Sequence, residues 1–363
     1  MTRERHDKSN QPAYRIGSER WDMQPLNACH RDQPVRHGRG TADGDEPSKL
    51  FDQGSHINWG NADTGNRRTA DRCWKYIVVC GDDFGMNLNI DAGMLELAAL
   101  GRLSAISCLS LGPTFTTHAR RLRDLDVDVG LHLNLTESFG LQDQPAVMPL
   151  PTLITRAYIS QLDSGWIDEQ LARQLDAFEG VLGRAPDYVD GHQHVHQLPG
   201  VLPRLLRVLE LRYGSDRPWL RHTAPGTQSG VPLRESAKAR LIGTLGAGSV
   251  ERAARSDGWR TNRRMLGVYD FHGGPRRYAQ LLHHWLNNAR DGDLLMCHPA
   301  LPGAADKLGA QRAAEFAVLA SAELGQWMSR NGVQIARANW PMRSATPETA
   351  CSVTPDSRDA GNR

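Results

Sequence analysis

Between residues 74 and 340 the chain alternates short apolar runs with longer stretches in which apolar residues recur at helical spacing. Residues 76–80 form a continuous apolar run of strand length, closed by Gly81, and residues 89–100 then show the helical period and end at Gly101. Further strands are expected at 105–111, 127–135, 188–190, 219–222, 266–271, 293–297 and 333–338, and further helices at 117–125, 168–182, 201–211, 233–244, 276–289 and 311–330. Residues 136–165 are expected to form a loop.

The expected strands are apolar throughout instead of alternating, which is typical of a parallel sheet covered on both faces. Seven or eight strand–helix units in about 265 residues favour an α/β fold with a (β/α) barrel, TIM-like and irregular in places, over an open doubly wound sheet. No G-x-G-x-x-G sequence follows the first strand, which argues against a nucleotide-binding fold.

Composition divides the chain into three parts. Residues 1–72 are rich in polar residues and Gly, and their large apolar residues are scattered. Such a segment cannot bury enough surface to offset its conformational entropy, so we expect a disordered or poorly structured N-terminal extension. Residues 343–363 are similar and are expected to form a flexible C-terminal tail. The folded domain is therefore expected over residues 73–342.

The charge balance, the lengths of the apolar runs and the cysteines indicate which partners and cellular location to expect. The 43 Lys and Arg residues and 41 Asp and Glu residues leave a net charge of +2, which gives no electrostatic case for a nucleic-acid partner. The apolar runs are too short for a transmembrane segment, and the charged start lacks the apolar region of a signal peptide. Cys80, Cys108 and Cys297 lie in apolar runs and are expected to be buried free thiols, which fits a reducing compartment. The expected location is cytoplasmic; the oligomeric state stays open, with a homodimer as one candidate.

Polar residues that can carry chemistry nearly all stand where an expected strand ends. They are Asp82, Asp83, His132, Asp190, His192, His194, His196, Arg221, His222, His272 and His298. Because the carboxyl ends of parallel strands converge on one face of a barrel, where its active site is built, we expect these side chains to meet there.

Asp82 and Asp83 can divide two tasks, since successive side chains at a strand end point in different directions. One carboxylate would bind a cation while the other acts as a base. A turn with Gly85 is the alternative explanation of the pair. His132 lies in an otherwise apolar strand, where an isolated His is more often a hydrogen-bonded core residue.

The run that contains His192, His194 and His196 is more specific. Three imidazoles spaced by two are expected to share one face of an extended segment, and neutral imidazole is a common ligand of zinc and related metals. A solvated surface loop is the alternative. His298, at the mouth of a strand, is a candidate general acid. Arg221 would orient a carboxylate or a substrate hydroxyl, or form an ordinary ion pair.

Jointly, one Asp and two His make a compact set of oxygen and nitrogen ligands for one divalent metal ion, such as Mg²⁺ or Zn²⁺. The remaining Asp and His supply a base and an acid. This inventory favours metal-dependent hydrolysis of an amide or ester, in which metal-bound water attacks the carbonyl.

Four motifs in order at expected strand ends resemble the YdjC-like carbohydrate deacetylases, which include diacetylchitooligosaccharide deacetylases and hopanoid-associated deacetylases. The motifs are Gly81-Asp82-Asp83-Phe84-Gly85, Gly130-Leu131-His132-Leu133, Asp190-Gly191-His192-Gln193-His194-Val195-His196 and Met296-Cys297-His298-Pro299. The resemblance covers about residues 74–340. Cys80-Gly81 stand where the family usually has Asn-Ala or similar, and Ala300 stands where Gly is frequent; neither departure removes a functional group.

The resemblance implies a (β/α) barrel, one divalent metal ion and removal of acetyl from an N-acetylated amino sugar, either an oligosaccharide or a lipid-linked sugar. The residues that it assigns are Asp83, His132 and His192 as metal ligands, Asp82 as the base and His298 as the acid. The choice of His192 over His194 as a ligand comes from the resemblance. Further candidates for substrate contact are His194, His196, Arg221 and His272.

Two other interpretations stay open. One is a different metal-dependent amide or ester hydrolase on a barrel; an enzyme of the amidohydrolase type would carry H-x-H after the first strand, where Asp82 and Asp83 stand. The other is a non-catalytic carbohydrate-binding barrel, which would need neither Asp82 nor His298.

Overall fold

A computed structural model describes residues 74–140 and 146–338. The expected disorder of residues 1–72 and 343–363 lies outside the described residues and stays a prediction. The strands are β1 (Lys75–Phe84), β2 (Ala105–Cys108), β3 (Asp128–Leu133), β4 (Tyr188–Gly191), β5 (Trp219–Leu220), β6 (Met265–Leu266), β7 (Leu294–Cys297) and β8 (Val333–Ile335). The α-helices are α1 (Leu88–Ala99), α2 (Phe115–His118), α3 (Leu150–Tyr158), α4 (Ser164–Leu182), α5 (Leu202–Tyr213), α6 (Leu233–Thr244), α7 (Ala247–Asp257), α8 (Gly274–Asn288), α9 (Gly309–Ala320) and α10 (Ala322–Arg330), and the 3₁₀ segments are η3 (Ala119–Asp124), η4 (His192–Gln197) and η5 (Gly214–Asp216).

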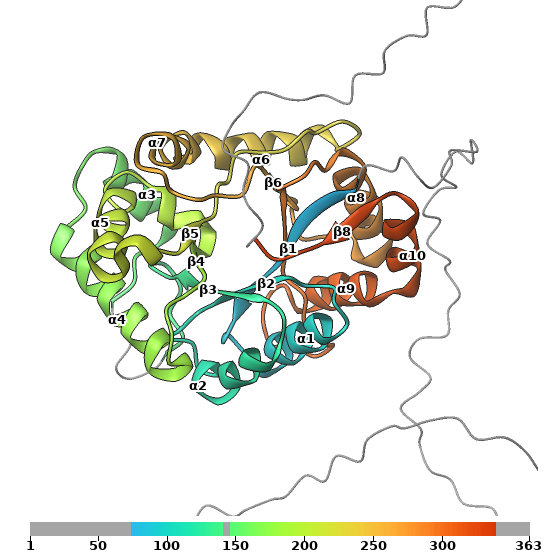
Figure 1. Ribbon diagram of the computed structural model, residues 1–363, viewed down its shortest axis with the longest axis horizontal. Helices are drawn as coiled ribbons and strands as arrows, with labels where there is room; N and C mark the ends of the chain where they lie inside the picture. The colour runs from blue at the N-terminus through green and yellow to red at the C-terminus, as the bar shows by residue number, and fades with distance from the viewer. Residues whose placement is uncertain (1–73, 141–145, 339–363) are drawn as a thin grey trace, which may run out of the picture. The chain divides into compact units, whose positions relative to one another are not determined.

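The strands pair in parallel in the order β5-β4-β3-β2-β1-β7-β6. Isolated parallel bridges then join Leu220 to Thr261 and Pro225 to Met265, so the two edges of the sheet meet. β8 pairs with β1 at residues 75–77, next to the part of β1 that pairs with β7. The predicted (β/α) barrel is therefore confirmed, with an irregular closure, and the helices lie outside the strands (Figure 1).

Successive side chains of β1 enter two different apolar clusters. Ile77 and Val79 belong to the larger cluster, which is shared with the helices, whereas Val78 and Cys80 belong to a smaller cluster. Strands β2, β4, β5, β6 and β7 contribute to that smaller cluster the residues Ala105, Tyr188, Trp219, Met265, Leu294 and Met296. Side chains that alternate across a strand and meet from several strands fill the interior of a barrel.

A glycine in β3 makes room for the ring of Tyr188 in this interior. A Cβ atom at Gly130 would lie 2.4 Å from the ring of Tyr188, so a larger residue there would displace that ring. The Tyr188 ring stacks on Trp219 at a centroid separation of 4.2 Å. Together these rings close the interior directly below the polar residues that follow them.

Helix α1 (Leu88–Ala99) begins and ends within one residue of the predicted helix 89–100. The Asn87 side chain accepts hydrogen bonds from the backbone N–H groups of Asn89 and Ile90 and so caps the first turn. Gly101 has a φ of 66° and ends the helix as a left-handed residue.

Several expectations about elements were wrong. The expected helix 117–125 is the end of the short α2 followed by the 3₁₀ segment η3, the expected loop 136–165 contains α3, and α7 forms where the pattern indicated no element. The expected helix 311–330 is two helices, because Ser321 leaves the helical conformation and caps α10 through the backbone N–H of Leu324. The expected strand 266–271 stops at Leu266, since Gly267 has a φ of 96° and a Cβ there would clash with the backbone of Met296.

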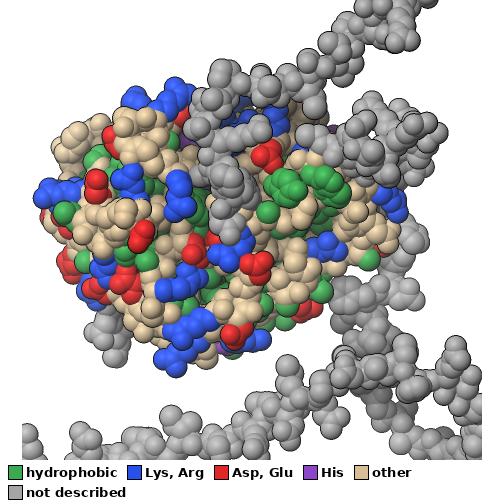
Figure 2. All heavy atoms as spheres, in the orientation of Figure 1, with side chains coloured by type: hydrophobic (Ala, Val, Ile, Leu, Met, Phe, Trp, Pro, Cys, Tyr) green, Lys and Arg blue, Asp and Glu red, His purple; other side chains and the backbone are tan. Residues whose placement is uncertain are grey.

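In the part of the chain that the structure describes, no helix has the length and apolar character needed to cross a membrane. On the face seen in Figure 2, basic and acidic side chains are mixed across the described surface, in line with the near-balanced charge of the sequence. Cys80, Cys108 and Cys297 are buried free thiols, as predicted.

Candidate active site

Polar side chains form the next layer of the barrel interior, on the carboxyl-terminal side of the smaller apolar cluster. Because side chains alternate along a strand, the position two residues after an inward apolar residue also faces inward. Four such pairs are Cys80 and Asp82, Tyr188 and Asp190, Trp219 and Arg221, and Met296 and His298. Strand alternation therefore gathers charged and titratable groups at the carboxyl end of the barrel.

The two aspartates lie inside β1, not after it, so that detail of the sequence analysis was wrong. The pairing of β1 with β2 is irregular between Gly81 and Phe84, and Asp83 has a φ of 79°. A bulge of this kind re-aims a side chain. As a result Asp82 contacts Arg221, whereas Asp83 contacts His132 and His192.

Asp83, His132 and His192 place three metal-ligating atoms within 4.8 Å of one another. Oδ1 of Asp83 lies 2.9 Å from Nδ1 of His192 and 3.5 Å from Nε2 of His132. The residues come from β1, β3 and the start of η4. The structure thus brings together the three residues that the family resemblance assigned to the metal.

Two of these three side chains are held by a partner on their other polar atom. Nδ1 of His132 lies 2.7 Å from Oδ1 of Asp190, and Nη2 of Arg312 donates to Oδ2 of Asp83 at 2.7 Å. Carboxylate–histidine pairs of this type fix the ring and its tautomer at metal sites. They leave Nε2 of His132 and Oδ1 of Asp83 facing each other.

Charged neighbours shift the pKa values of His132 and Asp83 in opposite directions. Burial alone would lower the pKa of His132, but the carboxylate of Asp190, helped by Asp82, outweighs it and raises that pKa to about 10. Burial would raise the pKa of Asp83, but Arg312 and His192 lower it well below its usual range. A carboxylate oxygen and two imidazole nitrogens are a donor set that fits a divalent cation, and His132 has to give up the proton on its ligating nitrogen to bind the ion.

Asp82 forms a two-pronged ion pair with Arg221, and both side chains are buried. Nη1 and Nη2 of Arg221 each donate to one oxygen of Asp82 at 2.6 Å, and Nη2 also lies 2.5 Å from Oδ2 of Asp190 and 2.9 Å from Sγ of Cys80. Burial raises the pKa of Asp82, but Arg221 outweighs burial and lowers it, so this carboxyl is ionised. Cys80, Asp82 and Asp190 also bring ligand atoms together, but the guanidinium fills the space between them.

The histidine run is not extended, so the prediction that three imidazoles share one face was wrong. Its residues form η4, in which Gln193 and His194 have positive φ values of 54° and 61°. His192 reaches Asp83, while His196 turns back so that its Nε2 lies 2.9 Å from the carbonyl oxygen of Arg221. Nδ1 of His194 is buried without a hydrogen-bond partner, and burial lowers the pKa of this ring well below its usual value.

His298 follows β7 and is half-buried, whereas Glu315 beside it is fully buried. Its backbone N–H donates to Oε2 of Glu315 at 2.6 Å, and its ring packs edge-on against Phe271. Nδ1 of the ring is buried without a hydrogen-bond partner. Burial lowers the pKa of His298 to about 4, so the ring is neutral at pH 7.

These groups open into a pocket of about 790 Å³. Its polar end is formed by Asp82, Asp83, His132, His192, His194, His298 and Arg312. Aliphatic side chains from α3 and α6 form another part of the wall, among them Ile154 and Ile242, and Tyr269 and Phe271 add aromatic rings. A largely apolar pocket with a few convergent polar groups is typical of a small-molecule site.

Of the four candidates for substrate contact, only one lines the pocket. His194 lines the pocket, whereas His196 and Arg221 are buried beside it and do not line it. His272 is exposed, and its Nδ1 lies 2.6 Å from the carbonyl oxygen of Asp270. Arg221 instead orients the carboxylates of Asp82 and Asp190, which was one of the roles considered for it.

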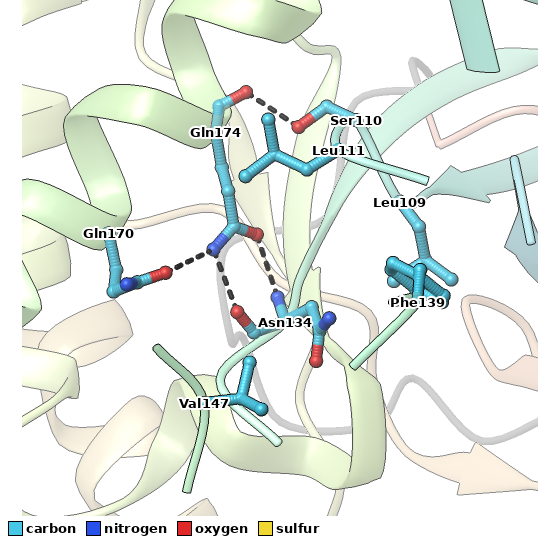
Figure 3. A pocket seen from close by; sticks show the side chains of 8 residues that line it. All are labelled: Leu109, Ser110, Leu111, Asn134, Phe139, Val147, Gln170 and Gln174. Atoms are coloured by element: carbon cyan, nitrogen blue, oxygen red, sulfur yellow. Dashed lines mark hydrogen bonds between the residues drawn. The ribbon is translucent and has the colours of Figure 1, made fainter. Parts of the chain in front are cut away.

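A second cavity, of about 10 Å³, lies against α4 (Figure 3). The side chain of Gln174 exchanges two hydrogen bonds with the backbone of Asn134, and the carbonyl oxygen of Gln174 accepts from Ser110. The volume has room for about one water molecule. We interpret the arrangement as a brace that fixes the chain two residues after His132.

Two charged residues of the site were not identified from the sequence. Arg312, which holds Asp83, and Glu315, which holds the backbone of His298, both lie on α9. Arg and Glu in an amphipathic helix ordinarily face solvent, so the sequence carries no signal that marks them. Asp190 was noted for its strand-end position alone, although its alternation with Tyr188 points it inward.

Comparison with known proteins identifies the family. A family model described as YdjC-like protein matches residues 76–330. A carbohydrate deacetylase from Mus musculus is 30% identical over 298 residues, which cover 71% of this chain and 92% of that protein. A chitooligosaccharide deacetylase from Serratia marcescens is 30% identical over 135 residues, which cover 36% of this chain and 53% of that protein.

Among solved structures, a putative cellobiose-phosphate cleavage protein from Enterococcus faecalis V583 matches with a TM-score of 0.53 at 19% identity, over 73% of this chain and 98% of that one. At this identity the match supports the fold alone. The resemblance drawn from the four motifs is confirmed by the family model and by the mouse relative. The chain therefore belongs to the YdjC-like protein family, whose matched members are named carbohydrate deacetylases, hydrolases of the amide bond.

Proposed function

We propose that the chain is a metal-dependent deacetylase that removes the acetyl group from an N-acetylated amino sugar. The observation that carries this proposal is the cluster of Asp83, His132 and His192 at the polar end of the pocket, beside an ionised Asp82 and a neutral His298. Asp83, His132 and His192 would hold a divalent ion, Mg²⁺ or Zn²⁺. Such an ion supplies a Lewis acid for the carbonyl oxygen of the acetamido group.

Asp82 is the base in this proposal. It lines the pocket next to Asp83, and the pair with Arg221 keeps it ionised and fixes the plane of its carboxylate. A fixed, ionised carboxylate takes up a proton from an attacking water with no reorganisation of its own. The pairing also makes Asp82 a weak base, because the guanidinium of Arg221 lowers the pKa of Asp82.

His298 is the acid in this proposal. When the water oxygen adds to the acetyl carbon and the C–N bond breaks, the departing nitrogen needs a proton. Since His298 is neutral in the free protein, the proton that the water gives up has to reach this ring before the bond breaks. The products are acetate and the free amino sugar, with one water consumed.

The pocket walls indicate what the rest of the substrate contacts. Glu137 and Lys238 offer polar atoms to a sugar. The aliphatic side chains of α3 and α6 would instead pack against an apolar substituent. Oligosaccharide and lipid-linked substrates therefore both belong in the test.

The test is acetate release from N-acetylglucosamine, diacetylchitobiose, triacetylchitotriose and a lipid-linked N-acetylglucosamine, each with and without a chelator. We expect release from at least one substrate, and chelator should abolish it. His272→Ala is the matched control, since this exposed histidine lies outside the pocket and should leave the rate unchanged. Bound metal without acetate release from any of these sugars would move the assignment to another acyl group.

A further inference from the structure

Strained backbone is concentrated at the pocket. Among the described residues, those other than glycine with a positive φ are Asp83, Ser160, Gln193, His194 and Phe271. All of these except Ser160 line the pocket. A positive φ is strained for a residue with a side chain and most unusual for a bulky aromatic residue, so the φ of 60° at Phe271 has to be held by its surroundings.

The ring of Phe271 meets the ring of His298 edge to face. The ring centroids are 4.8 Å apart and the planes are 89° apart. This is a preferred geometry of an aromatic pair and stabilises the contact beyond the burial of the two rings. Both residues line the same pocket.

His298, like His194, lacks the hydrogen bond that orients three other histidines of the site. His132 is held by Asp190, His192 by Asp83 and His196 by the carbonyl oxygen of Arg221. Nδ1 of His298, by contrast, is buried without a hydrogen-bond partner. The contact with Phe271 therefore fixes the plane of the His298 ring, as a hydrogen bond fixes the rings of His132, His192 and His196.

Phe271 is itself fixed from two sides. Its ring packs against Tyr269 at 4.8 Å, and the ammonium of Lys238 lies 5.0 Å from its centroid while donating to the carbonyl oxygen of Tyr269. The hydroxyl of Tyr269 donates to Glu315, whose other oxygen accepts from the backbone N–H of His298. Glu315 thus joins the segment that carries Phe271 to the segment that carries His298.

We propose that Phe271 is a positioning residue: its strained backbone sets its ring against His298, and that contact aims the imidazole into the pocket. The inference rests on the proposed function, in which His298 passes a proton to the leaving nitrogen. It implies that loss of the aromatic ring slows turnover with little change in substrate binding, because misplacement of a catalytic group by about 1 Å costs up to about 100-fold.

The kinetic test compares Phe271→Leu and Phe271→Tyr with Phe178→Leu, a buried aromatic residue of the core that does not line the pocket. We expect F271L to lower kcat roughly ten- to hundredfold with KM within about twofold, and F271Y and F178L to stay near the wild type. In a His298→Gln background F271L should cause no further loss, since two residues that act through one step are not additive. An equal loss in both backgrounds would overturn the proposal.

A spectroscopic test is independent of activity and so separates this inference from the proposed function. In protein labelled at its histidines, the ring C–H signal that disappears in H298Q belongs to His298. Loss of the Phe271 ring current alone would shift this signal, so the readout is its linewidth: we expect the signal to broaden in F271L but to stay sharp in F271Y and F178L. A signal that stays sharp in F271L would overturn the positioning role even if the enzyme is an active deacetylase, and a broadened signal would support it even if no acetate is released.

Discussion

The guanidinium of Arg221 pairs with both oxygens of the Asp82 carboxylate, with one nitrogen donating to each oxygen at 2.6 Å. Both groups are buried, and the same guanidinium also pairs with Asp190, which in turn holds His132. One cation thus fixes the proposed base and, through Asp190, one proposed metal ligand. Arg221 therefore links the proposed base to a proposed metal ligand, although its own side chain does not line the pocket.

Removal of this guanidinium should destabilise the fold. Arg221→Met leaves Asp82 and Asp190 buried without their shared cation, so we expect the free energy of unfolding to fall by about 3–5 kcal/mol in denaturant titration. Arg255→Met is the matched control, because Arg255 pairs with Glu251 on the exposed face of α7 and should matter by less than about 0.5 kcal/mol. Equal stability of the two variants would show that the buried network contributes little.

The role of Asp82 as the base predicts a separation of metal binding from turnover. Asp82→Asn keeps an oxygen that accepts from Arg221 but cannot take up a proton, so we expect metal content to stay and the rate to fall by roughly 10²- to 10⁴-fold. Elemental analysis and acetate release on the same sample measure both. Full activity in this variant would rule out Asp82 as the base.

The role of His192 as a ligand predicts the opposite pattern. His192→Ala removes one of three donors, so we expect lower metal occupancy by elemental analysis after dialysis against limiting metal, together with loss of activity. His272→Ala removes an exposed histidine outside the pocket and should leave occupancy unchanged. Unchanged occupancy in H192A would remove His192 from the ligand set.

Glu315 predicts a pH dependence of stability. Burial raises the pKa of this carboxyl from 4.5 to about 7, so the folded chain holds a proton there that the unfolded chain releases near pH 4.5. The stabilising effect of that proton is full below pH 4.5 and is lost as the pH rises through about 7, a change of about 3 kcal/mol. We expect the stability difference between wild type and Glu315→Gln to move by this amount over that range in denaturant titrations. A difference that is flat from pH 4.5 to 7 would show that Glu315 has an ordinary pKa.

Most of the fold could be predicted from the sequence because apolar runs and helical periods are local signals. Continuous runs such as residues 76–80 predict buried parallel strands, and the glycine after α1 predicts its end. The short strands β5 and β6 are two residues long, too short for a pattern to define their ends. The break at Ser321 was hidden because the helical period of apolar residues continues across it.

The candidate site was predictable where it followed strand ends and not where it depended on backbone strain. Asp83, His132 and His192 meet as the motif order implied. The left-handed residues Gln193 and His194 break the extended geometry that the histidine spacing suggested. No pattern of residue types predicts a left-handed conformation at residues other than glycine. Phe271 was overlooked for the same reason.

The most direct test of the account is metal reconstitution of a single protein sample. The chain is stripped with chelator, assayed for acetate release on the best acetamido sugar, and assayed again after addition of Mg²⁺ or Zn²⁺, with Asp83→Ala treated in the same way. We predict that the stripped protein is inactive, that one metal restores release in the wild type, and that neither metal restores it in D83A. Full acetate release by the stripped wild type, or full restoration of D83A, would contradict a metal-dependent deacetylase centred on Asp83.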